Sequence, residues 1–196
     1  IFSASTVEGT TRPASMAFTV WRLTPMASAN CCWVMRTSAR STRILFFICD
    51  RVFQAPQFPA EYREEYQQHA EEFWREHGVF ASDKLVGFNI GSAVVTKRWA
   101  PERFAKVADI LAEKGYKPVF FGGTMDEEMV QEAVSFMKTT PVVATGSFRI
   151  GELAAAMRRC SLIITNDSGP MHVAISQKVP IVAMYGPSSP KLYGPY

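Results

Sequence analysis

From about residue 60 onward, short apolar runs alternate with segments in which apolar residues recur every three or four positions. Near-continuous apolar runs are typical of strands that are buried on both faces of a parallel sheet. The expected strands are 84–91, 117–123, 141–146, 161–165 and 179–186, and the expected helices are 61–77, 100–115, 126–139, 150–160 and 169–178. This alternation predicts an α/β domain over residues 60–196, with a Rossmann-like parallel sheet and helices on both faces.

Residues 1–59 follow a different pattern. Residues 1–43 show no sustained period of two or 3.6, and turn-forming residues are scattered through them. The apolar run ILFFIC (44–49) could form one buried strand, and QAPQFPAE (54–61) is typical of a proline-rich turn or linker. We therefore predict an irregular or remnant N-terminal segment and linker over residues 1–59.

Charge is distributed unevenly along the chain. The formal net charge is +3, but residues 1–60 hold six Arg and no Lys against Glu8 and Asp50. Residues 61–196 hold 15 basic and 16 acidic side chains, so no basic stripe marks the α/β domain. This distribution predicts that nucleic acid is not a partner. The longest apolar run, 44–49, is far shorter than a membrane span.

The cysteines predict neither a zinc site nor a disulfide framework. They are Cys31, Cys32, Cys49 and Cys160, with no CxxC pair and no clustering with the three His. We therefore expect no metal site and a reducing compartment. Cys160 is interpreted as a small buried apolar residue.

Four expected strands end in polar or glycine-rich sequences. They are NIGSAVVTKRW (89–99), FFGGTMDEE (120–128), TNDSGPMH (165–172) and YGPSSP (185–190). Because ligands of open parallel sheets bind at the carboxyl ends of the strands, these loops should meet at one edge. Each also has a purely structural interpretation: a helix cap, a tight turn or solvated charge. Their coincidence at one edge favours a site for a phosphate or a sugar.

The TNDSGPMH segment carries the strongest signal. Asp167 or Ser168 could cap the following helix, and Pro170 suits its first turn. Gly169 leaves room for a ligand to approach the backbone, and His172 could donate a hydrogen bond to a phosphate or sugar oxygen. The start of the helix is then a candidate anion site.

From Leu85 to Tyr196 the chain closely resembles glycosyltransferase family 9, the ADP-heptose:lipopolysaccharide heptosyltransferases. The resemblance rests on TKRWAPERFAKVADIL, VFFGGTMDEE, the D-[ST]-G-x-x-H-x-A element at 167–174, and YGPSSP with YGPY. It implies the C-terminal, donor-binding half of a GT-B enzyme that inverts the anomeric centre without a metal or other cofactor. The implied partners are ADP-heptose and the lipopolysaccharide core acceptor.

The resemblance also implies roles for individual residues. Lys97 matches the lysine that neutralises the leaving diphosphate, and Ser92 matches a hydroxyl that faces it. Phe148 corresponds to an apolar residue on the adenine, and one of Asp126, Glu127 and Glu128 to the acid on the ribose; we take Glu128 as the candidate. The implied donor-binding set is Ser92, Lys97, Glu128, Phe148, Asp167, Ser168, Gly169 and His172. Ala93 stands where some members have a second hydroxyl.

The general base is expected in the N-terminal domain of the family, which residues 1–50 do not resemble. We therefore expect a monomeric fragment that binds the donor but is inactive alone, on the cytoplasmic side of the inner membrane with peripheral contact to it. Two alternatives remain at this point: a non-catalytic nucleotide-binding module, and a GT-B enzyme that uses another nucleotide sugar.

Overall fold

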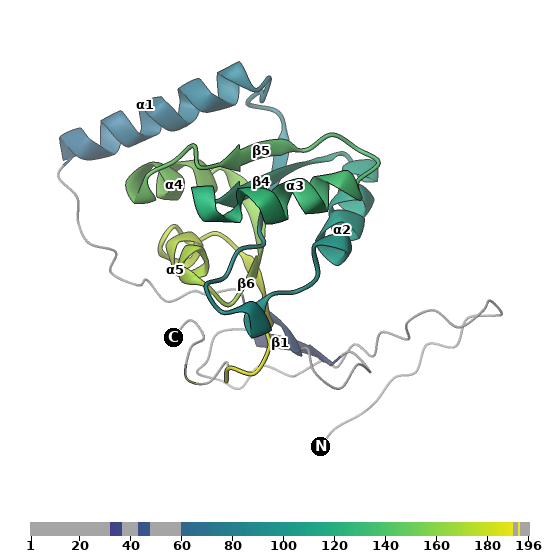
Figure 1. Ribbon diagram of the computed structural model, residues 1–196. Coiled ribbons are helices and arrows are strands. Elements are labelled where there is room, and N and C mark those ends of the chain that lie inside the picture. Colours follow the sequence, from purple (N-terminus) through teal and green to yellow (C-terminus); the bar gives the residue numbers. More distant parts are fainter. Residues whose placement is uncertain (1–31, 37–42, 48–59, 190–191, 193–196) are drawn as a thin grey trace.

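The computed structural model describes residues 32–36, 43–47, 60–189 and 192, and its main body is an α/β fold (Figure 1). The strands are β1 (Cys32–Arg36), β2 (Arg43–Phe47), β3 (Lys84–Asn89), β4 (Tyr116–Gly122), β5 (Val142–Thr145), β6 (Cys160–Asn166) and β7 (Ile181–Tyr185). The α-helices are α1 (Ala60–Glu76), α2 (Pro101–Glu113), α3 (Glu127–Ser135), α4 (Ile150–Met157) and α5 (Gly169–Ser176). Two 3₁₀ helices, η1 (Val95–Lys97) and η2 (Thr124–Asp126), follow β3 and β4.

The described strands form one sheet in the order β1-β2-β7-β6-β3-β4-β5. From β7 to β5 every neighbouring pair is parallel, whereas β2 joins β7, and β1 joins β2, in antiparallel pairs. The predicted Rossmann-like sheet is therefore confirmed. The chain runs outward from β3 through β4 to β5 and then crosses back to β6, so the strand order reverses between β3 and β6. Ligands of open α/β sheets bind at such a switch point.

Within the segment predicted to be irregular or a remnant, the structure forms the strand β1. The pairing of Cys32–Arg36 with Arg43–Phe47 places this segment next to a strand that itself pairs with β7. A five-residue strand is too short to give a reliable period in the sequence, and its partner selects it. Residues 44–47 of the run predicted as a strand at 44–49 lie in β2. Residues 1–31, 37–42 and 48–59 lie outside the described residues.

Apolar side chains fill both sides of the sheet. One core lies under α1, α4 and α5 and includes Phe73, Trp74, Phe121, Met157 and Ile175. The other lies under α2 and α3 and includes Phe88, Phe104, Phe120, Val130 and Ile164. Neighbouring strand residues such as Phe120 and Phe121 alternate between the two cores, which confirms the prediction of helices on both faces. No helix among the described residues is long and apolar enough to cross a membrane.

One buried carboxylate explains why α3 ends earlier than the sequence predicts. Asp109 of α2 accepts hydrogen bonds from the backbone N–H groups of Lys138 and Thr139 and from the Thr139 hydroxyl, at 2.7–3.2 Å. These bonds hold the chain after Ser135 in a turn, so the helix predicted over 126–139 ends there. Burial of Asp109 opposes its ionisation, but the bonds from Thr139 and Lys138 outweigh it and lower the pKa of the carboxyl below 3.8.

We expect Asp109→Asn to lower the free energy of unfolding by about 1–2 kcal/mol near neutral pH, because the amide cannot accept all of these bonds. Since the pKa of Asp109 is lowered in the folded state, its stabilisation is present above the unfolded pKa of about 4 and is lost as the pH falls through the lower folded value. Urea unfolding of both proteins between about pH 7 and pH 2 measures the difference, which should shrink at the acid end. A difference that does not change with pH would contradict this assignment.

Candidate functional site

The carboxyl ends of β3 and β6 are joined by buried side-chain hydrogen bonds. Nδ2 of Asn89 donates to Oγ1 of Thr165 at 3.1 Å and to Oγ of Ser168 at 2.8 Å. In return, Nδ2 of Asn166 donates to the carbonyl of Ile90 at 2.7 Å. Asn89, Thr165 and Asn166 are fully buried. These bonds link the two loops at the switch point of the sheet.

Lys97 and Asp167 form an ion pair across this junction. The distance from Lys97 Nζ to Asp167 Oδ2 is 2.8 Å, and the side chains are 22% and 5% exposed. The hydroxyl of Ser188, in the loop after β7, also donates to Oδ2 of Asp167. Ser92 is buried, and its hydroxyl donates to the Asp167 carbonyl at 3.4 Å. Three of the four predicted strand ends therefore meet at Asp167.

Backbone contacts hold the segment that carries Lys97. Nε of Arg98 donates to the carbonyl of Ser92 at 2.8 Å, and the backbone N–H of Trp99 donates to Oδ1 of Asn166 at 3.1 Å. On the other side, a Cβ added at Gly186 would come within 2.6 Å of the Thr96 carbonyl oxygen. Only a residue without a side chain allows this approach, so the turn after β7 supports η1 directly.

The start of α5 faces open space. Apart from its chain neighbours and the backbone of its own helix, a Cβ built on Gly169 has no heavy atom of the described residues within 4 Å, and His172 is exposed one turn further along. Ser168 is the N-cap residue, but the expected side-chain cap is absent. Asp167 is committed to Lys97, and Ser168 accepts from Asn89 and donates to the Asn166 carbonyl at 3.3 Å. The prediction of a capping side chain is thus wrong, because both side chains have partners elsewhere.

The acidic candidates lie at the end of β4. Asp126 is partly buried in η2, and its Oδ2 accepts a hydrogen bond from the backbone N–H of Gly123 at 2.9 Å. A Cβ on Gly91 would lie 2.2 Å from Oδ1 of Asp126, so this carboxylate rests against the loop that follows β3. Glu127 and Glu128 are exposed on the first turn of α3. Of the three acids, Asp126 contacts the loop that leads to Ser92 and Lys97.

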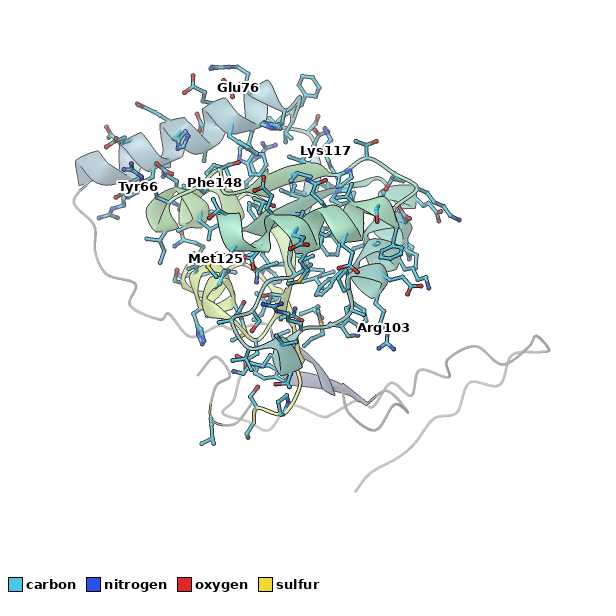
Figure 2. All side chains as sticks on the ribbon, in the orientation of Figure 1. Tyr66, Glu76, Arg103, Lys117, Met125 and Phe148 are labelled. Carbon is cyan, nitrogen blue, oxygen red and sulfur yellow. The ribbon has the colours of Figure 1, made fainter. Side chains whose placement is uncertain are left out.

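Phe148 lies in the loop between β5 and α4. Figure 2 shows it below α1, the helix that carries Tyr66. Its ring contacts Phe73 edge-on at a centroid distance of 4.7 Å and His69 at 5.9 Å. Glu152 secures this loop, since it accepts a hydrogen bond from the Arg149 backbone N–H at 2.6 Å and pairs with His69 at 3.1 Å. Phe148 is partly buried and packs against the core under α1, α4 and α5.

The structure therefore brings Ser92, Lys97, Asp167 and Ser168 together directly, with Gly169 and His172 on the adjoining helix. Phe148 lies in the loop after β5 and Glu128 in the first turn of α3, and their contacts with a ligand stay predictions. Cys160 is buried as predicted, and its burial raises the pKa of the thiol to about 12.

Sequence reasoning missed Asn89, Asn166 and Ser188 as individual contributors. Asn89 had a detectable signal, because it is a polar residue inside the apolar run KLVGFNIG. Asn166 and Ser188 lie within two of the predicted site loops, but nothing in their spacing indicates which partner each would contact.

The comparisons with known proteins identify the family of the chain. The family model described as glycosyltransferase family 9 (heptosyltransferase) matches residues 8–196. Lipopolysaccharide heptosyltransferase 2 of Escherichia coli is 34% identical over 116 residues, which are 57% of this chain and 33% of that protein. Lipooligosaccharide heptosyltransferase 2 of Haemophilus influenzae is 31% identical over 128 residues, 63% of this chain and 37% of that protein. The chain thus spans about a third of the length of these relatives.

Two solved structures share the fold. The glycosyl transferase family 9 protein of Veillonella parvula is 64% identical with a TM-score of 0.66, over 67% of this chain and 38% of that one. The E. coli ADP-heptose lps heptosyltransferase II is 28% identical with a TM-score of 0.61, over 71% and 41%. In each case the match covers less than half of the solved chain, as expected for one half of a GT-B fold. With its family model matched from residue 8 to residue 196, the chain belongs to glycosyltransferase family 9.

Proposed function

We propose that this chain is the donor-binding part of a heptosyltransferase that transfers heptose from ADP-heptose to the inner core of lipopolysaccharide. The observation that carries this proposal is the convergence of Ser92, Lys97, Asp167 and Ser168 at the switch point between β3 and β6. Loops at this position in an open α/β sheet are suited to bind a nucleotide. The names of the relatives and the family motif supply the sugar and the acceptor.

In this proposal the diphosphate lies against the start of α5 and the Lys97 side chain. Transfer breaks the bond between C1 of the heptose and the β-phosphate oxygen, and that oxygen then gains negative charge. The Lys97 ammonium group offsets this charge, and Asp167 positions Lys97. A preorganised donor of this kind contributes about 3–4 kcal/mol to the transition state. The acceptor hydroxyl forms the new bond to C1 and gives its proton to a carboxylate base, which we place in the N-terminal domain of the family.

The nucleoside would occupy the neighbouring strand ends. We propose that Phe148 contacts the adenine and that an acid after β4 binds the ribose hydroxyls. Glu128 was the candidate from the sequence, and Asp126 is the stronger one, because its carboxylate rests against the loop after β3. His172, exposed on α5, would donate to a phosphate or sugar oxygen.

We further propose that the protein acts as a monomer on the cytoplasmic side of the inner membrane, in peripheral contact with it, and without a nucleic-acid partner. Calorimetry with ADP-heptose, ADP and UDP tests the donor. We expect the two adenine nucleotides to bind and UDP to bind at least tenfold more weakly. Tight binding of UDP with no binding of ADP would overturn the assignment. Heptose transfer to a Kdo-terminated acceptor by this chain alone would contradict the placement of the base.

The substitution Gly169→Ala should weaken ligand binding without lowering the stability of the fold. Its added methyl group meets no described atom, and alanine favours a helix more than glycine does, so stability should be unchanged or slightly higher. A ligand that approaches the backbone at the start of α5 would collide with the methyl group, and we expect ADP affinity to fall about tenfold, the equivalent of about 1.4 kcal/mol.

Ser161→Ala is the matched control, because Ser161 is exposed at the opposite end of β6. Thermal unfolding and calorimetry with ADP should show no change for this variant. Equal ADP affinity in Gly169→Ala and the original protein would remove the start of α5 from the site.

A further inference from the structure

Asn89 is an unusual residue for the position it occupies. It ends β3, is fully buried, and follows the apolar residues Val86 and Phe88. Its Nδ2 donates two hydrogen bonds, but among the described residues no donor meets its Oδ1. A buried acceptor without a partner costs about 1–3 kcal/mol, so an apolar residue of similar size would serve the strand better. The amide therefore requires an explanation other than stability.

The directions of the surrounding hydrogen bonds supply one. The hydroxyls of Thr165 and Ser168 both donate to the Asn166 carbonyl, at 2.8 Å and 3.3 Å. Since a hydroxyl has one proton, each must act as the acceptor toward Asn89. The longer Ser168 bond is the weaker of the two, and Ser168 is partly exposed whereas Thr165 is fully buried.

We propose that Asn89 is a positioning residue for the donor nucleotide and acts through Ser168. Its N–H occupies one lone pair of Ser168 Oγ, so the hydroxyl proton is directed to another acceptor, here the Asn166 carbonyl. When a diphosphate lies at the start of α5, the Ser168 hydroxyl rotates and donates its hydrogen bond to a phosphate oxygen in place of the Asn166 carbonyl. The new bond is stronger because its acceptor is charged. The chain from Asn89 through Ser168 to the phosphate also polarises each of its bonds. The inference rests on the proposed function.

A purely structural role makes the opposite prediction for stability. If Asn89 mainly holds the loops together, its replacement should weaken the fold and the binding of ADP in parallel. If it positions Ser168, Asn89→Leu removes the unpartnered oxygen and leaves both hydroxyls bonded to the Asn166 carbonyl. Stability should then stay level or rise while ADP affinity falls.

The test combines urea unfolding with calorimetry on ADP for the original chain, Asn89→Leu, Ser168→Ala and the double variant. We expect Asn89→Leu to weaken ADP binding roughly five- to tenfold, less than the complete loss of a charge-assisted hydrogen bond, because the Ser168 hydroxyl remains. The double variant should bind ADP about as weakly as Ser168→Ala, because the two residues act in one chain. Asn89→Ala, which removes the amide without adding bulk, should give the same loss if Leu perturbs the packing.

Ser176→Ala is the matched control. Ser176 ends α5, away from the proposed site at the start of that helix, and its partly buried hydroxyl donates to the Val173 carbonyl at 2.7 Å. Its ADP affinity should not change. Unchanged ADP affinity in both Asn89 variants, or losses for Asn89→Leu and Ser168→Ala that add in full, would overturn this inference alone. Absence of ADP binding by the original chain would overturn the proposed function and this inference with it.

Discussion

Replacing Lys97 by Met should lower the free energy of unfolding by about 3 kcal/mol, because it leaves the Asp167 carboxylate buried without its counter-charge. Asp167 is 5% exposed, and apart from Lys97 its Oδ2 receives the hydroxyl of Ser188. Adding Asp167→Asn to Lys97→Met removes the uncompensated charge and should restore most of the loss. Urea unfolding of the two single variants and the double variant measures this coupling.

Lys106→Met is the control for this experiment. Lys106 pairs with Glu102 on α2, but the two side chains are 68% and 53% exposed, so water solvates the remaining carboxylate. This variant should unfold almost as the original protein does. If Lys97→Met and Lys106→Met behave alike, the Lys97–Asp167 pair does not stabilise the fold. ADP binding adds a second readout, since the stable double variant should still bind ADP severalfold more weakly if Lys97 contacts the diphosphate.

Trp74→Ala should be the most damaging single change in the core, with an expected loss of about 3–5 kcal/mol. Trp74 is 3% exposed and packs edge-on against Phe121 of β4 and at a tilt against Phe148. Its removal leaves a cavity between α1 and the sheet, which the neighbouring rings cannot fill without moving. Because Phe148 forms part of that wall, we also expect ADP affinity to fall.

Ile110→Ala is the control for this variant. Ile110 is an apolar residue of α2 that is 52% exposed, so its truncation removes little buried area and should change stability by less than about 0.5 kcal/mol. Thermal unfolding of both variants gives the comparison. A small loss for Trp74→Ala would mean that α1 contributes little to the domain, contrary to the packing.

The elements from α1 to β7 could be predicted because each carries its own period and its own boundary residues. The edge of the sheet that carries the candidate site could be predicted from the same alternation of strands and helices, since parallel strands place their carboxyl ends together. The contacts between residues that are far apart in the sequence could not be predicted. Asp109 lies in α2 and accepts the hydrogen bonds of the turn that follows α3. Ser168 accepts a hydrogen bond from Asn89 instead of capping α5 with its side chain. The short strand β1 depends on pairing with β2, which a local pattern does not encode.

The same limit applies to the candidate site. The motifs predict Lys97 and Asp167 individually, but only the fold shows that they form an ion pair with each other. Likewise, Asp126, Glu127 and Glu128 are equivalent in the sequence, and the closeness of Asp126 to Gly91 distinguishes them.

The crossing of the chain from β5 back to β6 has a consequence for synthesis on the ribosome. Asn89 and Ser168 are 79 positions apart, so the two halves of the binding edge emerge at very different times. A nascent chain that has released β3, β4 and β5 can begin to fold, but closing this long loop must await β6 and the start of α5. Nucleotide capture should therefore begin only after Ser168 has left the ribosome.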